Sequence, residues 1–113
     1  SSLMLALMAS GFNGQNFAFV GYLPVDKSLR AKRIKELESI VYKTSQTQIF
    51  IEAPYRNNQM LESLIGTLNS DTMICVAADV SMESQQILSK TARQWKSFKI
   101  DLHKRNTVFL IYK

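Results

Sequence analysis

The sequence predicts a small α/β domain with a mixed, mostly buried sheet of about four or five strands flanked by helices. Apolar segments rich in β-branched and aromatic residues alternate along the chain with segments of helical periodicity, which is typical of sheets covered by helices. The chain has 113 residues, enough for one hydrophobic core but too few for two. We therefore treat residues 1–113 as a single domain.

The first elements are predicted from two apolar segments. Residues 1–10 are apolar on nearly all sides, which predicts a well-covered core helix capped by one of the first two serines and ended by Gly11. Residues 17–22 are aromatic and β-branched and stop before Pro24. They predict a buried strand followed by a loop.

A long basic helix is expected next, beginning at Asp26 or Ser28. Its apolar residues recur at three-to-four spacing between charged ones, at Ile34, Leu37, Ile40 and Val41. Residues 48–51 then predict a second strand. After the turn at residues 52–54, a further helix is indicated by the apolar positions Leu61, Leu64, Ile65 and Leu68.

The last third of the chain is predicted to complete the sheet. Residues 72–78 form a nearly continuous apolar run, as in a strand covered on both faces, and Asp79 stands at its end. A short strand at 85–88, a short helix at 91–98 and a last strand at 107–112 follow. In such sheets ligands bind at the ends of strands, so the loops after strands are where a site is expected.

Charge and cysteine content bear on partners and compartment. The net charge of +5 is compatible with anionic partners such as nucleic acid, although a solvated face of extra lysines is the more ordinary explanation. Cys75 is the only cysteine and cannot form an internal disulfide, which predicts a cytoplasmic location. The apolar start lacks a basic flank and is too short to span a bilayer. Because a helical pattern begins directly at Ser1, we expect the chain to be cut from a longer protein.

Few residues are suited to chemistry on their own. The four glycines never occur in the spacing of a phosphate-binding loop or a dinucleotide fingerprint. His103 is the only histidine and has no cysteine near it, so it is predicted to be a loop residue and no metal site is expected. No residue is assigned as catalytic.

Residues 50–57 form the most distinctive segment, a strand-to-helix turn that combines an acid, a small residue, a proline, an aromatic and a base. Ala53 would let a ligand approach the backbone, the free amides of the helix start can bind polar groups, and Arg56 can pair with a carboxylate or phosphate. Alternatively, the helix dipole stabilises Glu52, and Arg56 pairs with it. The residues alone favour neither explanation.

Three segments match a known family in order and spacing: SSLMLALMASG at 1–11, FVGYLP at 19–24 and FIEAPYR at 50–56. They resemble the C-terminal half of tetrapyrrole-methylase-type methyltransferases, and the nearest branch is the small-subunit ribosomal RNA ribose 2′-O-methyltransferases. The match is strong up to about Leu68 and weaker after Asp79. The resemblance implies a two-domain enzyme whose cleft holds S-adenosylmethionine between this domain and an N-terminal α/β domain, so this fragment alone is expected to be inactive.

The resemblance also implies site residues and partners. By position, the cofactor contacts fall on Ala9, Ser10, Gly11, Glu52, Ala53, Pro54, Ala77 and Ala78. Tyr55 and Arg56 would border the substrate side. The implied partners are the N-terminal domain, a second copy in a homodimer, and an RNA or tetrapyrrole substrate, with no membrane.

Two departures from the ribosomal RNA branch leave the acceptor open. Residues 78–82 replace an Arg-Glu-Leu-Thr-Lys segment, and residues 105–107 replace a Lys-Gly-Glu element. If RNA is the acceptor, the basic helix with Arg30, Lys32 and Arg33 is expected to bind it. The alternative function is a non-catalytic basic module that binds RNA or an acidic protein.

Overall fold

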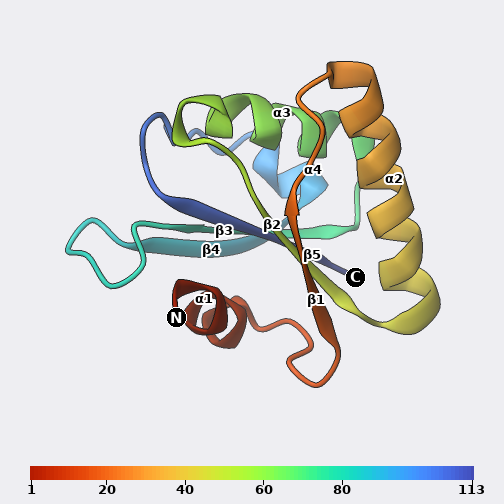
Figure 1. The fold of residues 1–113 in the computed structure, drawn as a ribbon, viewed down its shortest axis with the longest axis horizontal. Coiled ribbons are helices and arrows are strands. Elements are labelled where there is room, and N and C mark those ends of the chain that lie inside the picture. Colours follow the sequence, from red (N-terminus) through yellow and green to blue (C-terminus); the bar gives the residue numbers. More distant parts are fainter.

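The computed structural model describes all residues from 1 to 113 and contains four α-helices, one short 3-10 helix and five strands (Figure 1). In chain order they are α1 (Ser2–Ser10), β1 (Phe17–Tyr22), α2 (Lys27–Thr44), β2 (Thr47–Ile51), η1 (Pro54–Arg56), α3 (Asn57–Thr67), β3 (Met73–Ala78), β4 (Gln86–Thr91), α4 (Ala92–Trp95) and β5 (Thr107–Tyr112).

The five strands form one mixed sheet in the order β1-β2-β5-β3-β4. β1 and β2 run parallel, whereas β5 is antiparallel to both β2 and β3, and β4 is antiparallel to β3. β5 is at the centre of the sheet between β2 and β3, and all but one residue of each of these three strands is buried. This architecture confirms the predicted fold class.

Helices cover the two faces of the sheet unequally. Helices α2, α3 and α4 lie on one face, and α1 lies alone on the other (Figure 1). The larger core, of 17 buried residues, includes Trp95, Phe50 and Phe109 and lies under the three helices. The smaller core, of seven buried residues, lies between α1 and the sheet and includes Cys75. The smaller cover leaves that side of the molecule richer in exposed apolar groups.

Local signals fix several element ends as the sequence predicts. Asp26 caps α2, and its side chain accepts a hydrogen bond from the amide of Leu29 at 2.9 Å. Gly11 ends α1 with a φ of 79°, a left-handed conformation that glycine adopts without strain. Thr91 and Gln94 form a reciprocal capping box at the start of α4.

Two predictions of burial are wrong. In α1 only Ala6, Leu7 and Ser10 are buried, and Met8 is 76% exposed, so the helix is not covered on all sides. β1 is an edge strand and alternates between exposed and half-buried positions, with Phe17 and Phe19 exposed. A buried apolar segment and an exposed one have the same residue pattern, so the sequence could not show that these two elements are partly exposed.

The region after β3 differs from the prediction in its element bounds. The fourth strand is longer than 85–88, and the helix predicted at 91–98 has only four residues, followed by a turn at Lys96 and Ser97. β4 pairs along its whole length with β3, from Met73 opposite Thr91 to Ala78 opposite Gln86. No helix of this structure is long and apolar enough to cross a membrane.

Candidate functional site

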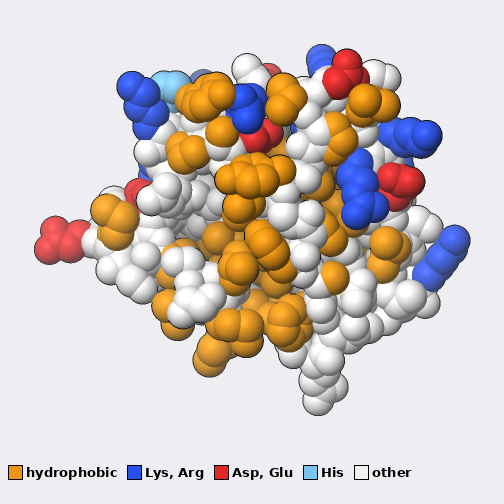
Figure 2. All heavy atoms as spheres, in the orientation of Figure 1, with side chains coloured by type: hydrophobic (Ala, Val, Ile, Leu, Met, Phe, Trp, Pro, Cys, Tyr) orange, Lys and Arg blue, Asp and Glu red, His pale blue; other side chains and the backbone are white.

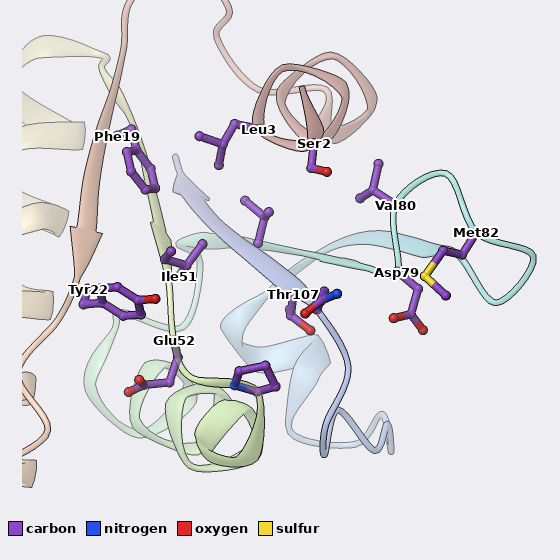
Figure 3. A pocket seen from close by; sticks show the side chains of 13 residues that line it. Ser2, Leu3, Phe19, Tyr22, Ile51, Glu52, Asp79, Val80, Met82 and Thr107 are labelled. Atoms are coloured by element: carbon purple, nitrogen blue, oxygen red, sulfur yellow. The ribbon is translucent and has the colours of Figure 1, made fainter.

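A hollow of about 380 Å³ opens where strands β1, β2 and β3 end and strand β5 begins (Figure 3). Its walls come from α1, the three strand ends and the loop after β3, and seven of its 13 lining residues are hydrophobic. The labelled side chains of Leu3, Phe19 and Ile51 form the apolar side, whereas Asp79 and Thr107 lie across from them. The hollow is at the strand ends, where the sequence predicts a ligand.

The turn after β2 contributes a buried carboxylate to this hollow. Glu52 is 5% exposed, and its Oε1 accepts a hydrogen bond from the amide of Ala53 at 2.7 Å. The Nε of Arg56 lies 3.3 Å from the same oxygen. The other oxygen, Oε2, is buried and has no hydrogen-bond partner within the protein. A buried acceptor without a donor costs free energy. Because this oxygen has almost no accessible surface, it lies behind the wall of the hollow and not on it.

The ion pair that the sequence offered as an alternative explanation of this turn is therefore present. Arg56 also lies over the ring of Tyr55, 4.6 Å from its centroid, and donates a hydrogen bond to its hydroxyl group. Tyr55 is 60% exposed, which leaves these two side chains at the rim of the turn. The ion pair uses one oxygen of Glu52, and the other is buried within the protein.

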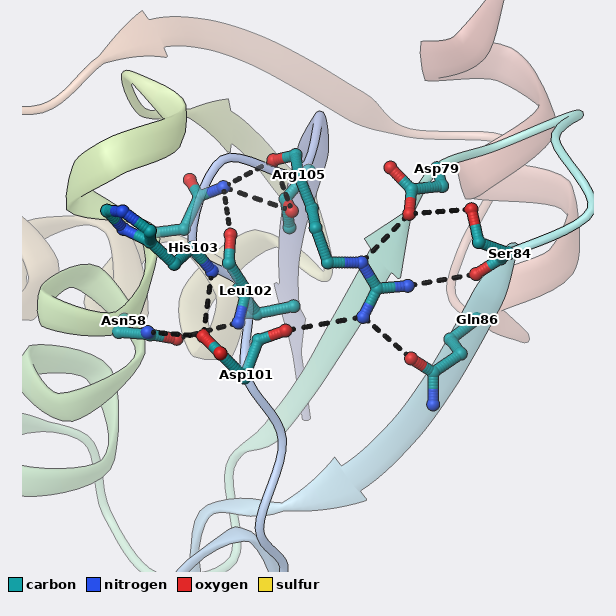
Figure 4. Close-up of polar contacts among 10 residues, drawn as sticks. Asn58, Asp79, Ser84, Gln86, Asp101, Leu102, His103 and Arg105 are labelled. Atoms are coloured by element: carbon teal, nitrogen blue, oxygen red, sulfur yellow. Dashed lines mark hydrogen bonds and ion pairs between the residues drawn. The ribbon is translucent and has the colours of Figure 1, made fainter.

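A second polar group fixes the opposite wall. Arg105 donates from Nε to Oδ2 of Asp79 at 2.8 Å, from Nη1 to Gln86 at 2.7 Å and from Nη2 to the carbonyl oxygen of Ser84 at 2.9 Å (Figure 4). Ser84 donates its hydroxyl hydrogen to the same Asp79 oxygen at 2.9 Å. We call this network the Arg105 clamp, and it ties the β3–β4 loop to the residues before β5.

The clamp makes the folded state sensitive to acid. The hydrogen bond from Arg105 is the largest cause that lowers the pKa of Asp79, and Ser84 and the Asn106 backbone add to it. Because the folded-state pKa lies below the unfolded value, the carboxylate stabilises the fold above that unfolded value and loses this contribution as pH falls through the folded-state pKa.

We therefore expect Asp79→Asn to lower the stability of the protein at pH 7 and to matter little at pH 2–3. Urea unfolding followed by circular dichroism across this range measures the difference. Asp71→Asn is the matched control, since Asp71 is 80% exposed and its pair with Arg93 contributes little. An equal loss for both variants, or a loss for Asp79→Asn that persists unchanged in acid, contradicts the assignment.

The predicted cofactor contacts lie in three different settings. Glu52 and Pro54 line the hollow, and Ala53 lies between them. Ala77 and Ala78 are fully buried at the end of β3, where the backbone passes below the hollow.

The predicted contacts of α1 lie at the other end of that helix. Ala9, Ser10 and Gly11 are at its C-terminal end, and the backbone oxygen of Ser10 accepts a hydrogen bond from Ser89 in β4. The lining residues from α1 are Ser2 and Leu3, roughly one helix length away, about 12 Å. The structure brings the 52–54 turn and the end of β3 together, and α1 meets them through its N-terminal turn.

Sequence reasoning missed several lining residues. Phe19 and Tyr22 were expected in a buried strand, and Met82 and Asn106 lie in loops that carry no motif. Arg105 was noticed only as a departure from a family pattern. Its pairing with Asp79 spans 26 positions, so only the sheet register that places Ala78 opposite Thr107 reveals it.

The fold is shared with solved methyltransferase structures. The methyltransferase CobJ superposes with a TM-score of 0.63 and 18% identity, over 97% of this chain and 47% of CobJ. The precorrin-6Y methylase of cobalamin biosynthesis from Archaeoglobus fulgidus gives a TM-score of 0.57 and 15% identity, over 99% of this chain and 45% of that one. This chain therefore has the fold of about half of a tetrapyrrole-type methylase.

Sequence similarity points to one branch. The chain is 28% identical over 86 residues to ribosomal RNA small subunit methyltransferase I from Vibrio cholerae, and 33% identical over 76 residues to the protein of the same name from Halalkalibacterium halodurans. These stretches cover 76% and 66% of this chain, but only 28% and 25% of those proteins. No protein-family model matches the chain. The resemblance inferred from the three sequence segments is confirmed, and the chain spans about a quarter of its relatives' length.

Proposed function

We propose that this chain is the C-terminal domain of an S-adenosylmethionine-dependent methyltransferase that acts on ribosomal RNA in the cytoplasm. The observation that carries the proposal is the partly apolar hollow at the strand ends, in a chain that is similar in sequence to ribosomal RNA methyltransferases. Ligands of open α/β sheets bind at such strand ends. The chain contributes one wall of the cofactor site, and methyl transfer requires the rest of the protein.

The hollow fits one part of S-adenosylmethionine. Its volume lies at the lower end of the range for small-molecule sites. Leu3, Phe19 and Ile51 would pack against the apolar parts of the cofactor. Glu52 would hold the 52–54 turn in place beside the cofactor through its hydrogen bond with the Ala53 amide and its ion pair with Arg56. The bound cofactor would supply an electrophilic methyl group, and the residues of this chain would hold it in place.

An exposed apolar face supports the shared-cleft arrangement. Hydrophobic side chains gather across the middle and lower part of the face shown in Figure 2, over α1 and β1. They include Met4, Leu5, Met8, Phe17, Phe19 and Tyr22. Patches of this kind mark interaction surfaces. Since the relatives are between two and three times as long as this chain, we propose that the N-terminal domain of the longer protein covers this face and closes the hollow.

The resemblance also implies a homodimer, in which a second copy would cover part of the same face. Sedimentation of the chain alone and joined to the N-terminal domain separates the two. Self-association of the chain alone that disappears in the joined protein indicates that the N-terminal domain occupies the face. Dimers that persist in the joined protein indicate that the second copy uses another surface.

Calorimetric titration of S-adenosylmethionine and S-adenosylhomocysteine tests the proposed function. We expect weak or no binding to this chain alone and clear binding to the protein that also contains the N-terminal domain. In the latter, Glu52→Gln is expected to weaken binding by about tenfold, roughly 1.4 kcal/mol. Glu62→Gln is the matched control on the exposed side of α3.

Three outcomes would overturn parts of the proposal. No binding to either protein would remove the cofactor assignment and favour a non-catalytic basic module. Equal, tight binding to this chain alone would contradict the shared cleft. Equal effects of the Glu52 and Glu62 variants would contradict the role of Glu52.

A further inference from the structure

The positive charge of this protein is concentrated in its last quarter. Residues 86–113 carry seven Lys or Arg and one Asp, whereas the first 85 residues carry seven Lys or Arg and eight Asp or Glu. The net charge of +5 therefore comes entirely from the end of the chain. Residues 84–100 contain four basic residues and no acidic one.

These four residues surround the short helix α4, and we call them the α4 basic cluster: Lys90, Arg93, Lys96 and Lys99. The ammonium group of Lys90 lies over the ring of Phe98, 4.3 Å from its centroid. Phe98 in turn packs edge-on against Trp95, with centroids 5.6 Å apart. Trp95 is buried and donates a hydrogen bond to the carbonyl oxygen of Ile74 at 2.9 Å. The cluster is therefore built on a rigid aromatic support.

The three lysines of the cluster are not neutralised by the protein. None of its five ion pairs includes Lys90, Lys96 or Lys99. Arg93 pairs with Asp71 at 3.1 Å, but both side chains are largely exposed, which makes that pair weak. Lys96, Phe98 and Lys99 are exposed next to one another along the chain.

The basic helix α2, which the sequence favoured as an RNA contact, is a poorer candidate. Arg30 is 5% exposed and donates to Ser63 and to the carbonyl oxygen of Val25. Arg33 and Lys35 face glutamates of their own helix. Figure 2 shows basic and acidic side chains intermixed over α2. Its remaining lysines, Lys27, Lys32 and Lys43, are spread along about 24 Å of helix.

The start of the α4 basic cluster, at Lys90 and Arg93, lies at the end of the sheet away from the hollow. Strand pairing places Tyr112, Met73 and Thr91 in one row, and α4 begins directly after Thr91. The row at the hollow consists of Thr107, Ala78 and Gln86, five residues or about 17 Å along β3. A small acceptor bound only in the hollow would not reach the cluster, whereas a long polyanion can contact both.

We propose that the α4 basic cluster is a docking surface for the phosphate backbone of RNA, distant from the reaction site. The choice of RNA over another polyanion rests on the proposed function. Closely spaced, unpaired lysines on a fixed support bind phosphates without reading sequence, because the interaction is electrostatic and releases counterions. The surface would orient the RNA and would favour RNA over a tetrapyrrole acceptor.

Fluorescence anisotropy of a labelled 24-nucleotide single-stranded RNA, titrated with the full chain at 50–200 mM KCl, tests this docking surface without cofactor. We expect Lys96→Glu with Lys99→Glu to weaken binding at least tenfold at 100 mM. The slope of log affinity against log salt should fall by about 1.4, because each lost phosphate contact contributes about 0.7. The matched control, Lys32→Glu with Arg33→Glu, changes the net charge equally and should weaken binding less than threefold.

Lys96→Gln with Lys99→Gln serves as the second variant and should give a smaller loss in the same direction, with an unchanged circular dichroism spectrum. Equal weakening by the α4 and α2 variants would overturn the proposal, because net charge alone would then explain binding. Absence of RNA binding by the unaltered chain, or tighter binding to phosphatidylserine vesicles than to RNA, would also overturn it. If the chain does not bind RNA but the protein with its N-terminal domain binds S-adenosylmethionine, only this docking surface is rejected. If the chain binds RNA through the cluster but the longer protein does not bind S-adenosylmethionine, only the proposed function is rejected.

Discussion

Replacing Trp95 with alanine is expected to remove about 3–5 kcal/mol from the free energy of unfolding, the range for truncating a large buried aromatic side chain. Trp95 is 1% exposed and belongs to the main core. Small domains have only about 5–15 kcal/mol in total, so much of the stability would be lost. Circular dichroism in urea measures the change, because the variant lacks the only tryptophan of the chain.

A second substitution separates packing from hydrogen bonding at this position. Trp95→Phe retains an aromatic ring but leaves the carbonyl oxygen of Ile74 without its indole donor, at a cost of about 1–3 kcal/mol. We expect the order unaltered protein, Trp95→Phe, Trp95→Ala in stability. An alanine variant as stable as the unaltered protein would show that α4 is not anchored to β3 through this side chain, and the rigid support of the α4 basic cluster would be lost with it.

The sequence predicted the elements well wherever local chemistry determines them. The cap at Asp26, the helix end at Gly11 and the buried run 72–78 all follow from side chains acting on their own neighbourhood. The order of the strands in the sheet could not be predicted, because the insertion of β5 between β2 and β3 depends on packing between segments far apart in the chain. The exposure of α1 and β1 was also not predicted, because burial depends on which other parts of the protein pack against a segment.

The 52–54 turn was the part of the candidate site that the sequence predicted best. The 52–54 turn carries an unusual combination of residue types, and both Glu52 and Pro54 line the hollow. The sequence predicted that α1 belongs to the site but not which of its ends lines the hollow. That depends on how the helix is oriented over the sheet. Asp79 was noticed at a strand end, whereas its partner Arg105 became visible only through the tertiary structure.

The two segments that differ from the ribosomal RNA branch contact each other in the structure. Segments 78–82 and 105–107 contain the two members of one ion pair, Asp79 and Arg105, which meet at 2.8 Å. The altered residues are therefore compatible with each other and retain an acid and a base.

Arg105→Ala is expected to loosen the β3–β4 loop and to open the wall of the hollow. Arg105 donates hydrogen bonds to Asp79, which lines the hollow, and to Ser84 and Gln86 beside it. The loop also contains two non-glycine residues with left-handed backbones, Asp79 at φ 53° and Ser81 at φ 71°. Such conformations persist only where surrounding contacts hold them. Hydrogen exchange of the amides of residues 79–86 should accelerate at least tenfold, while the amides of β5 remain protected.

Arg93→Ala provides the control, because it removes the same kind of side chain from an exposed pair and should leave exchange in residues 79–86 unchanged. In the protein with its N-terminal domain, Arg105→Ala should also weaken S-adenosylmethionine binding by at least tenfold, since a mobile wall must be ordered before it can contact a ligand. Faster exchange without weaker binding would show that the clamp stabilises the loop but that the cofactor does not contact it. Unchanged exchange would show that backbone pairing between β3, β4 and β5 is sufficient to hold the wall.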